Sequence, residues 1–418
     1  MVTAGMATGG ARAVARCDAL GVAPYSDAPD MLFRAWLTPA FAATQQAIAG
    51  WMRAAGMAVR IDPATNLVGR YEGLAADAPA MLIGSHIDSV RDAGRYDGPL
   101  GVMLGIECVA ALNQAGRRLP FAIEVIAFGD EEGSRFPSPM LTSRALAGTL
   151  PADALDHIGA DGTPLADALA AYGARPPDLP AAARDPATIV AYLEAHIEQG
   201  PALEADGLAV GTVTGIAAQA RYRVTVGGTA GHAGTSAMAL RRDALAAAAE
   251  MVLGVERIGG AGAADLVATV GAMIVAPGAP NVIPGDVEFT VDVRALDAGV
   301  RDAAAAAIVA EAQRIAARRG VQVAAIRVHV LAPSPCDPAL VALMDAALAT
   351  AGQPVRRLVS GAGHDAMAMA ALCPTAMLFI RCRGGISHHP AEHVDPADAD
   401  VALAVMRAFI DHLELHHG

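Results

Sequence analysis

Two short, mostly apolar runs, each followed at once by residues that bind metal ions, most constrain the fold of this chain. The run at 80–83 leads into Gly-Ser-His-Ile-Asp-Ser-Val at 84–90, and the run at 121–128 leads into Gly-Asp-Glu-Glu-Gly at 129–133. Such runs are typical of buried parallel strands, and open α/β sheets bind ligands at the carboxyl ends of their strands. An apolar stretch at 101–115 predicts a buried helix between them, so the order strand, helix, strand predicts a parallel sheet.

A different pattern marks the segment between residues 217 and 330. Apolar and polar residues alternate along 221–226 and 287–294, which predicts antiparallel strands with one covered face. A chain of 418 residues is also long for one compact unit. We therefore expect an α/β protein with a mixed, mostly parallel sheet flanked by helices, and an inserted α+β domain of ferredoxin-like type. The expected domains are a discontinuous metal-binding catalytic domain, 1–216 and 331–418, and an inserted domain, 217–330. Further helices are expected at 11–20, 31–56, 241–255, 297–318, 338–351 and 398–412.

Composition excludes several classes of function. The net charge of -13 and the pI near 5.3 argue against nucleic-acid binding, which depends on positive charge. The chain contains no lysine, so it can use neither a lysine Schiff base nor a P-loop lysine. The five cysteines form no C-x-x-C pair, and we expect free thiols in a reducing compartment. Because the sequence shows neither a secretory signal nor an apolar run that could cross a membrane, we expect a cytoplasmic protein.

Residues suited to metal binding recur at strand ends and in loops. Taken alone, each has a plain alternative: Glu131 and Glu132 could form an acidic loop, and His196 could be a structural histidine. Taken together they make a set of nitrogen and oxygen ligands without a thiolate, which suits a pair of Zn²⁺ or Mn²⁺ ions, with Co²⁺ or Ni²⁺ also acceptable. A shared carboxylate offsets the repulsion between two dications, and Asp97 is the candidate bridge. The candidate ligands are His86, Asp97, Glu132, His196 and His388.

From about Cys17 to its C-terminus the chain resembles the amidases of the hydantoinase/carbamoylase group, within the M20 metallopeptidase superfamily. The resemblance rests on a series of motifs that occur in the family's order. They are Gly-Ser-His-Ile-Asp-Ser at 84–89, Tyr-Asp-Gly at 96–98, Glu-Glu-Gly at 131–133, His-Ile-Glu-Gln-Gly at 196–200, Gly-His-Ala-Gly-Thr at 231–235, Asn-Val-Ile-Pro-Gly at 281–285, Ser-Gly-Ala-Gly-His-Asp-Ala at 360–366 and Ile-Ser-His-His-Pro-Ala-Glu at 386–392.

The resemblance implies a division of the candidate ligands between two divalent ions in each subunit. It assigns His86 and His196 to one ion. It assigns Glu132 and His388 to the other ion, with Asp97 shared by both.

The resemblance also implies the catalytic groups. Glu131 would take a proton from the attacking water and deliver it to the leaving nitrogen. Asp88 would orient His86. His232 would donate to the oxyanion of the tetrahedral intermediate. In relatives the residue matching His232 reaches the active site of the other subunit, so the inserted domain is expected to be a lid that also forms a homodimer.

A substrate-binding set is implied as well. Gln219, Asn281 and Arg294 resemble the residues that hold substrate in the family, and an arginine fork suits bidentate binding of a carboxylate. The backbone N–H of Gly363 could bind the same carboxylate. Without the resemblance, Arg294 is equally well explained as an exposed residue of an alternating strand.

The loop at 89–98 and the segment at 11–20 look most like the allantoate amidohydrolase branch. The expected substrate is then a small ureido carboxylate, cleaved with release of ammonia and CO2. The alternatives are an N-carbamoyl-L-amino acid hydrolase or β-ureidopropionase, an M20 aminoacylase or dipeptidase, and a non-catalytic binding protein. The complete ligand set together with Glu131 argues against the last of these.

Overall fold

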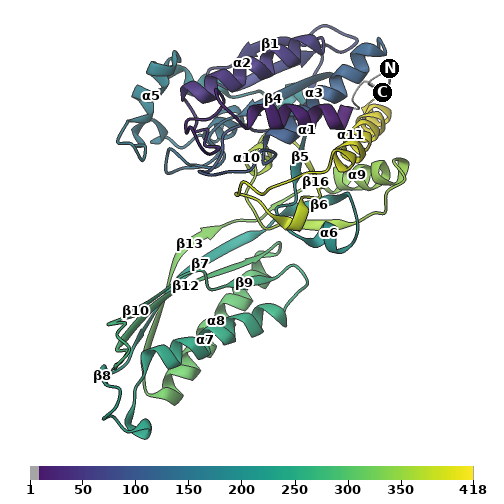
Figure 1. The fold of residues 1–418 in the computed structure, drawn as a ribbon. Helices are drawn as coiled ribbons and strands as arrows, with labels where there is room; N and C mark the ends of the chain where they lie inside the picture. Colours follow the sequence, from purple (N-terminus) through teal and green to yellow (C-terminus); the bar gives the residue numbers. More distant parts are fainter. Residues whose placement is uncertain (1–8, 418) are drawn as a thin grey trace, which may run out of the picture. The chain divides into compact units, whose positions relative to one another are not determined.

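The computed structural model describes residues 9–417 (Figure 1), which divide into two compact units. The larger unit contains the described residues up to Thr214 and from Cys336 onward, and the smaller unit is Gly215–Pro335. The expected range of the inserted domain was 217–330, and its roles in dimerisation and as a lid remain predictions. No helix within the described range is both long and apolar enough to span a membrane.

A mixed sheet forms the centre of the larger unit, with the strand order β1-β2-β4-β3-β5-β16-β6-β14 and with β15 joined to β6. The inner strands β4, β3, β5 and β16 are parallel, whereas β2 and β6 join them antiparallel. This arrangement confirms the predicted mixed α/β class. The strands are β1 Ala58–Ile61, β2 Leu67–Tyr71, β3 Ala80–His86, β4 Ala122–Phe128, β5 Ile189–Ile197, β6 Val210–Ile216, β14 Ser334–Pro335, β15 Arg357–Ser360 and β16 Thr375–Ile380.

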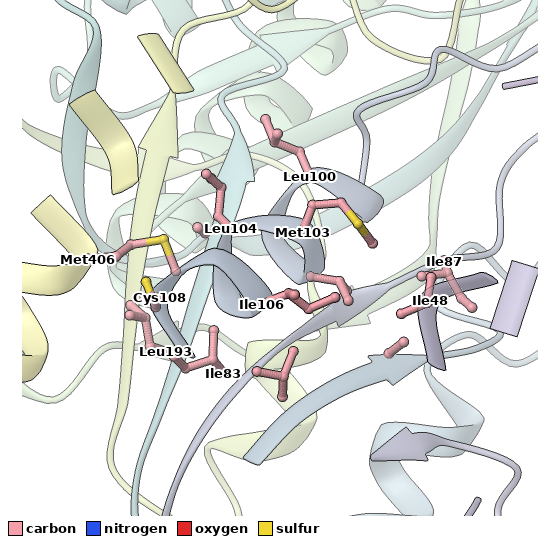
Figure 2. Close-up of a cluster of buried hydrophobic side chains, with 14 of the residues drawn as sticks. Ile48, Ile83, Ile87, Leu100, Met103, Leu104, Ile106, Cys108, Leu193 and Met406 are labelled. Carbon is pink, nitrogen blue, oxygen red and sulfur yellow. The ribbon is translucent and has the colours of Figure 1, made fainter. Parts of the chain in front are cut away.

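Helix α3, Pro99–Gln114, confirms the buried helix that was predicted at 101–115. Figure 2 shows its side chains Leu104 and Cys108 in one cluster of buried hydrophobic side chains that also contains Ile83 of β3 and Leu193 of β5. The helix approaches β5 closely at Gly101, where an added Cβ would lie 2.1 Å from the carbonyl oxygen of Ala195. Only glycine allows that approach. The other α-helices of the larger unit are α1 Gly9–Leu20, α2 Pro39–Ala54, α4 Leu141–Leu146, α5 Leu165–Tyr172, α6 Ala202–Ala205, α9 Pro338–Thr350, α10 Asp365–Met369 and α11 Pro396–His417.

The helix predicted at 31–56 is wrong in its first part, because α2 begins only at Pro39. Residues before it run extended beside the loop at 89–93, where Ser89 N donates to Arg34 O and Ala93 N donates to Leu32 O. Thr38 then caps α2 by accepting a hydrogen bond from Phe41 N through its side chain. Tertiary pairing therefore overrides local helical character here.

The smaller unit has an antiparallel sheet, with the strand order β10-β12-β7-β13 and with β9 also paired to β12. The helices α7 and α8 bury its inward-facing side chains, including Val224, Phe289 and Val291. Central β7 and β12 with their crossover helices give the predicted α+β, ferredoxin-like arrangement. The elements are β7 Ala218–Gly227, β8 Gly231–His232, α7 Ala244–Gly260, β9 Val267–Thr269, β10 Met273–Ala276, β11 Val282–Ile283, β12 Asp286–Ala295, α8 Ala298–Arg319 and β13 Gln322–Leu331.

Candidate metal centre

Two histidines meet at the carboxyl ends of neighbouring parallel strands. His86 ends β3 and His196 lies near the end of β5, and their Nε2 atoms are 3.5 Å apart. Each Nδ1 faces a backbone carbonyl: His86 Nδ1 lies 3.1 Å from Asp88 O, and His196 Nδ1 lies 2.9 Å from Ile197 O. Because a carbonyl only accepts hydrogen bonds, each Nδ1 must carry a proton. Both Nε2 atoms are thereby turned toward the same space, as metal-binding histidines require.

Asp97 lies between these histidines and a third one. Its Oδ1 is 3.0 Å from His196 Nε2 and 3.6 Å from His86 Nε2, whereas its Oδ2 is 3.2 Å from His388 Nε2. The residue after it, Gly98, has φ 84, and an added Cβ there would lie 2.6 Å from the His86 ring. Glycine is therefore needed in this Tyr-Asp-Gly turn. The geometry matches a carboxylate shared between two positions.

The Glu131–Glu132 pair is held by Asp88. The pair lies in the loop after β4, because that strand ends at Phe128 and Asp130 turns the chain with φ 61. The backbone N–H groups of Glu131 and Glu132 donate to the two carboxylate oxygens of Asp88, each at 3.2 Å. The expected role of Asp88 is thus corrected: its backbone carbonyl, rather than its carboxylate at 3.7 Å, faces His86 Nδ1.

The two glutamate side chains point to different partners. Glu132 Oε1 lies 3.5 Å from His388 Nε2, and Glu131 Oε2 lies 3.9 Å from His86 Nε2. Four groups in the described chain bring ligand atoms within 4.8 Å of one another, and two of these groups share Asp97. Those two groups are His86, Asp97 and His196, and Asp97, Glu132 and His388.

The donor set fits divalent cations. All the converging atoms are imidazole nitrogens or carboxylate oxygens, the ligands that Zn²⁺ and Mn²⁺ accept. Asp97 Oδ1 is buried and accepts no hydrogen bond from the described residues. A buried oxygen without a donor is costly, and a cation would satisfy it. The five predicted ligands therefore come together as expected, and their coordination of metal remains a prediction.

Charge is concentrated in this cluster. Burial raises the pKa of Glu131 well above its ordinary value, and burial together with Asp97 raises the pKa of Glu132 to about 7. The hydrogen bond to Asp97 raises the pKa of His388 to about 9. Although burial opposes it, the nearby His196 holds the pKa of Asp97 well below its usual range. A bound dication would replace these protons and keep the ligands in their metal-binding forms.

Several supporting residues were not predicted. Glu392 Oε1 accepts the backbone N–H groups of Tyr96 (2.7 Å) and Asp97 (3.1 Å), which fixes the shared carboxylate in place. Gln199 Nε2 and Ser387 Oγ donate to Asp97 Oδ2 at 2.8 and 2.5 Å. The sequence offers no signal that pairs Glu392 with Asp97, since hundreds of residues separate them.

Two further buried residues, Glu194 and His364, lie close to His196. Glu194 is fully buried and accepts hydrogen bonds from Ser85 Oγ (3.1 Å) and Ala366 N (2.8 Å). The ring of His364 lies with its centroid 4.4 Å from that of His196. Glu194 could have been found from sequence, because residues two apart on a strand share one face.

Of the predicted substrate-binding residues, Gly363 lies in the larger unit. An added Cβ at Gly363 would lie 2.9 Å from Met140 Cε and 3.9 Å from Glu131 Oε1. The backbone of Gly363 therefore lies beside the proposed general base.

The other predicted substrate-binding residues and the predicted catalytic residue His232 lie in the smaller unit, where they form two separate groups. Gln219 and Arg294 are cross-strand partners on β7 and β12, and both donate to Asp292, Gln219 Nε2 at 2.6 Å and Arg294 Nε at 2.8 Å. His232 is exposed on β8, beside Asn281, whose carbonyl accepts from Ala233 N at 2.9 Å.

These two places are far apart within the smaller unit. The two-stranded β8–β11 sheet meets the larger sheet where Gly228 N donates to Gly285 O, next to the start of β12, whereas Arg294 lies near the end of β12. Eight residues of strand from Asp286 to Arg294 span about 26 Å, at roughly 3.3 Å per residue. One small ligand therefore cannot contact both places in a single smaller unit.

Comparison with known proteins agrees with the resemblance. The family model described as Peptidase family M20/M25/M40 matches residues 82–412. An N-carbamoyl-L-amino acid amidohydrolase of Geobacillus stearothermophilus is 45% identical over 86% of this chain and 88% of its own length. An allantoate deiminase of Arabidopsis thaliana is 41% identical over 96% of this chain and 81% of its own length.

Solved structures give the same result. The amidase of the hydantoinase/carbamoylase family from Burkholderia multivorans has a TM-score of 0.89 and 37% identity, covering 96% of this chain and 97% of its own. A Bacillus subtilis protein described as a dinuclear metal binding peptidase of the M20 family shares the fold, with a TM-score of 0.56 at 17% identity, covering 96% of this chain and 97% of its own. The chain therefore belongs to peptidase family M20/M25/M40, and it is a hydrolase of carbon–nitrogen bonds.

Proposed function

We propose that this protein is a binuclear metal-dependent amidohydrolase that cleaves the ureido carbon–nitrogen bond of a small carboxylate, with allantoate as its substrate. The observation that carries the proposal is the position of Asp97, whose two oxygens face different histidines while Glu131 lies beside the same cluster. This arrangement supports two adjacent candidate cation positions and leaves Glu131 as a carboxylate that need not be a ligand.

The residues that would hold the cations are His86, Asp97, Glu132, His196 and His388. Two divalent ions held there would supply Lewis-acid chemistry, which polarises a scissile carbonyl and lowers the pKa of an attacking water toward about 7. Glu131 is buried and its raised pKa favours accepting a proton, so it is suited to take the proton of this water. The same carboxylic acid can then deliver the proton to the leaving nitrogen, which departs as ammonia.

We assign substrate binding to the polar groups that the family resemblance implies. Arg294 offers a guanidinium fork to the substrate carboxylate, and Gln219 lies opposite it in the strand register. The N–H of Gly363 would bind the same carboxylate. Asn281 would bind the ureido group, and His232 would stabilise the oxyanion.

The separation of about 26 Å along β12 supports a homodimer. If Arg294 and His232 both serve one substrate, they must come from different chains. The outer edge strand β13 carries the exposed apolar side chains Ile326, Val328 and Val330. Exposed apolar edge strands favour pairing with a second copy, and two-fold symmetry would complete both active sites.

Allantoate and N-carbamoyl-L-amino acids are the two substrates to distinguish. Plant relatives named allantoate deiminase match 92–96% of this chain at 39–41% identity. The carbamoylase of Geobacillus stearothermophilus matches a smaller share, 86%, at a higher identity of 45%. Together with the loop at 89–98, the longer matches favour allantoate, and the higher identity keeps the carbamoylase as the second candidate.

A substrate panel tests the proposal. The enzyme is stripped with chelator and reloaded with Mn²⁺ or Zn²⁺, and ammonia release is measured from allantoate, N-carbamoyl-L-methionine and N-carbamoyl-β-alanine. N-acetyl-L-methionine and a dipeptide test the aminoacylase and dipeptidase alternatives through release of the amino acid. We expect the highest kcat/KM with allantoate, because polar groups built for its second ureido arm would be left unpaired by the analogues. Faster turnover of a carbamoyl amino acid would identify a carbamoylase with the same metal chemistry.

A further inference from the structure

The larger unit contains a cavity of about 720 Å³ between α2, the edge strand β1 and the end of α5. Its apolar lining includes Leu37, Ala49, Val59, Ile61 and Leu67. Its volume lies within the range of about 300–1,000 Å³ that is typical of small-molecule sites. The described residues that line it include no member of the candidate metal centre.

The inner wall of this cavity is polar but satisfied. Tyr172 Oη donates to Gln45 Oε1 at 2.7 Å, and Gln45 Nε2 donates to Thr65 O at 2.6 Å. Gln45 is only 5% exposed, so this chain of hydrogen bonds fixes the wall without leaving a buried group in need of a partner. A ligand would therefore meet aliphatic side chains and no unsatisfied buried polar group there, so its inner part should be apolar.

The charged lining is entirely positive. Among the described lining residues there are two arginines, Arg53 and Arg60, and no carboxylate. Arg53 lies exposed in the last turn of α2, and no other residue between 9 and 417 forms a hydrogen bond or ion pair with its side chain. An apolar cavity with an unpaired guanidinium at an exposed position is complementary to an amphipathic anion.

The guanidinium of Arg60 is also only weakly paired with a carboxylate. Its nearest carboxylate is Glu124, at 3.6 Å, and Glu124 is already bound more closely by Arg184 at 2.7 Å and by Arg70 at 3.0 Å. Three guanidinium groups thus share one buried carboxylate. The lining itself carries the positive charges of Arg53 and Arg60 and no carboxylate, which favours an anionic ligand group.

We propose that this cavity is a second ligand site, separate from the metal centre, for a small amphipathic monoanion. Its aliphatic or aromatic body would pack against Leu37, Ala49 and Val59, and its carboxylate would pair with Arg53 and Arg60. A medium-chain fatty acid has this chemistry, with one charged end and an apolar body that fits the volume.

The test uses decanoate as the probe and isothermal titration calorimetry of the full-length, metal-loaded enzyme. Ala42→Trp places an indole in the cavity, since Ala42 lines it, and Arg53→Glu reverses the charge at its exposed arginine. Matched controls are Ala43→Trp, one position along α2 and outside the lining, and Arg407→Glu, an exposed helical arginine of α11. Circular dichroism verifies that all four variants fold.

Decanoate should bind the wild-type enzyme with one molecule per chain. Its affinity should fall at least about tenfold in Arg53→Glu, because a charge-assisted hydrogen bond contributes about 1.5–3 kcal/mol, and binding should be lost in Ala42→Trp. Both controls should bind as the wild type does. Absence of binding, equal affinity in the cavity variants, or displacement of decanoate by allantoate or N-carbamoyl-L-methionine would each overturn the proposal. The last outcome would place decanoate at the metal centre, and none of these outcomes depends on which ureido substrate the enzyme cleaves.

Discussion

Asp97 and His196 face each other with Oδ1 3.0 Å from Nε2, although one comes from the loop before α3 and the other from the end of β5. The contact depends on the packing of α3, because Gly101 brings that helix against the carbonyl of Ala195, the residue before His196. The packing of α3 thus helps to set the geometry of the candidate metal centre.

The shared carboxylate gives the first prediction. Asp97→Asn should lower the affinity for both metal ions by more than about 100-fold, since losses of 10–100-fold follow from removing even an outer partner of a metal ligand. The metal content of the protein after gel filtration, measured by mass spectrometry, checks this. Asp92→Asn is the matched control, because Asp92 is exposed in the same loop. Full metal content in Asp97→Asn would exclude Asp97 as the bridge.

The two adjacent glutamates should differ in their effects. Glu131→Gln should keep both ions and lose turnover by about 10²–10⁴-fold, the usual contribution of a general base. Glu132→Gln should instead lose metal, because Glu132 faces His388 within the cluster. Metal analysis and kcat measured on the same preparations separate the two roles. Near-normal turnover of Glu131→Gln would require another base.

Much of this site could be predicted from sequence because its ligands follow strands. His86 and His196 end two apolar runs, and parallel strands bring their carboxyl ends to one edge of the sheet. Asp97 was found from its glycine-flanked motif. The role of Glu392 could not be predicted from sequence. Its carboxylate holds the backbone of Asp97, a residue that is distant in the chain and that only the fold brings near.

Charged residues within the core were also missed. Arg34 is 1% exposed, and its guanidinium donates to the carbonyls of Leu20, Tyr25 and Ile87. In the sequence it lies in a segment with helical character, and nothing local indicates that it crosses the interior. Tertiary pairing decided both its burial and the late start of α2.

Arg34 therefore gives a prediction about stability. Arg34→Met should lower the free energy of unfolding by about 3 kcal/mol, because two buried carbonyls and one partly buried carbonyl would lose their donor and each buried group costs about 1–3 kcal/mol. Urea unfolding followed by circular dichroism measures the change. Arg91→Met is the control, since Arg91 is exposed and stacks over Phe33 with its guanidinium carbon 4.5 Å from the ring centroid. Equal stability of both variants would contradict the structural role of Arg34.

Glu124 predicts a dependence of stability on pH. Burial favours its neutral form, but the hydrogen bonds from Arg184 and Arg70 and the charges of Arg184 and Arg60 outweigh it and lower the pKa of Glu124. A carboxyl whose pKa is lower in the folded state stabilises the fold above its unfolded pKa, near 4.5, and loses that contribution as the pH falls toward the folded pKa.

The difference in unfolding free energy between the wild type and Glu124→Gln should accordingly be larger at pH 6 than at pH 4. Urea unfolding at the two pH values measures it, with chelator present so that metal binding does not contribute. Glu72→Gln serves as the control, because the Glu72 side chain is 51% exposed although it also pairs with Arg70. A difference that stays constant with pH would show that Glu124 is not held in its charged form.

The last prediction concerns the proposed dimer. The part of β12 from Asp286, beside the β8–β11 pair, to Arg294 spans about 26 Å, so a shared active site requires His232 from the second chain. The variants His232→Ala and Glu131→Gln should each be inactive. In a mixed dimer, one site combines an intact Glu131 from one chain with an intact His232 from the other.

After subunit exchange in a 1:1 mixture, half of the dimers should be mixed, each with one complete site, so activity should recover to about one quarter of the wild-type value. A mixture of Glu131→Gln with Asp97→Asn is the matched control, because both changes lie in the larger unit and no combination restores a site. Heterodimers verified by native mass spectrometry that remain inactive would show that His232 does not act across the interface. Equal recovery in the control mixture would show that the regained activity has another source.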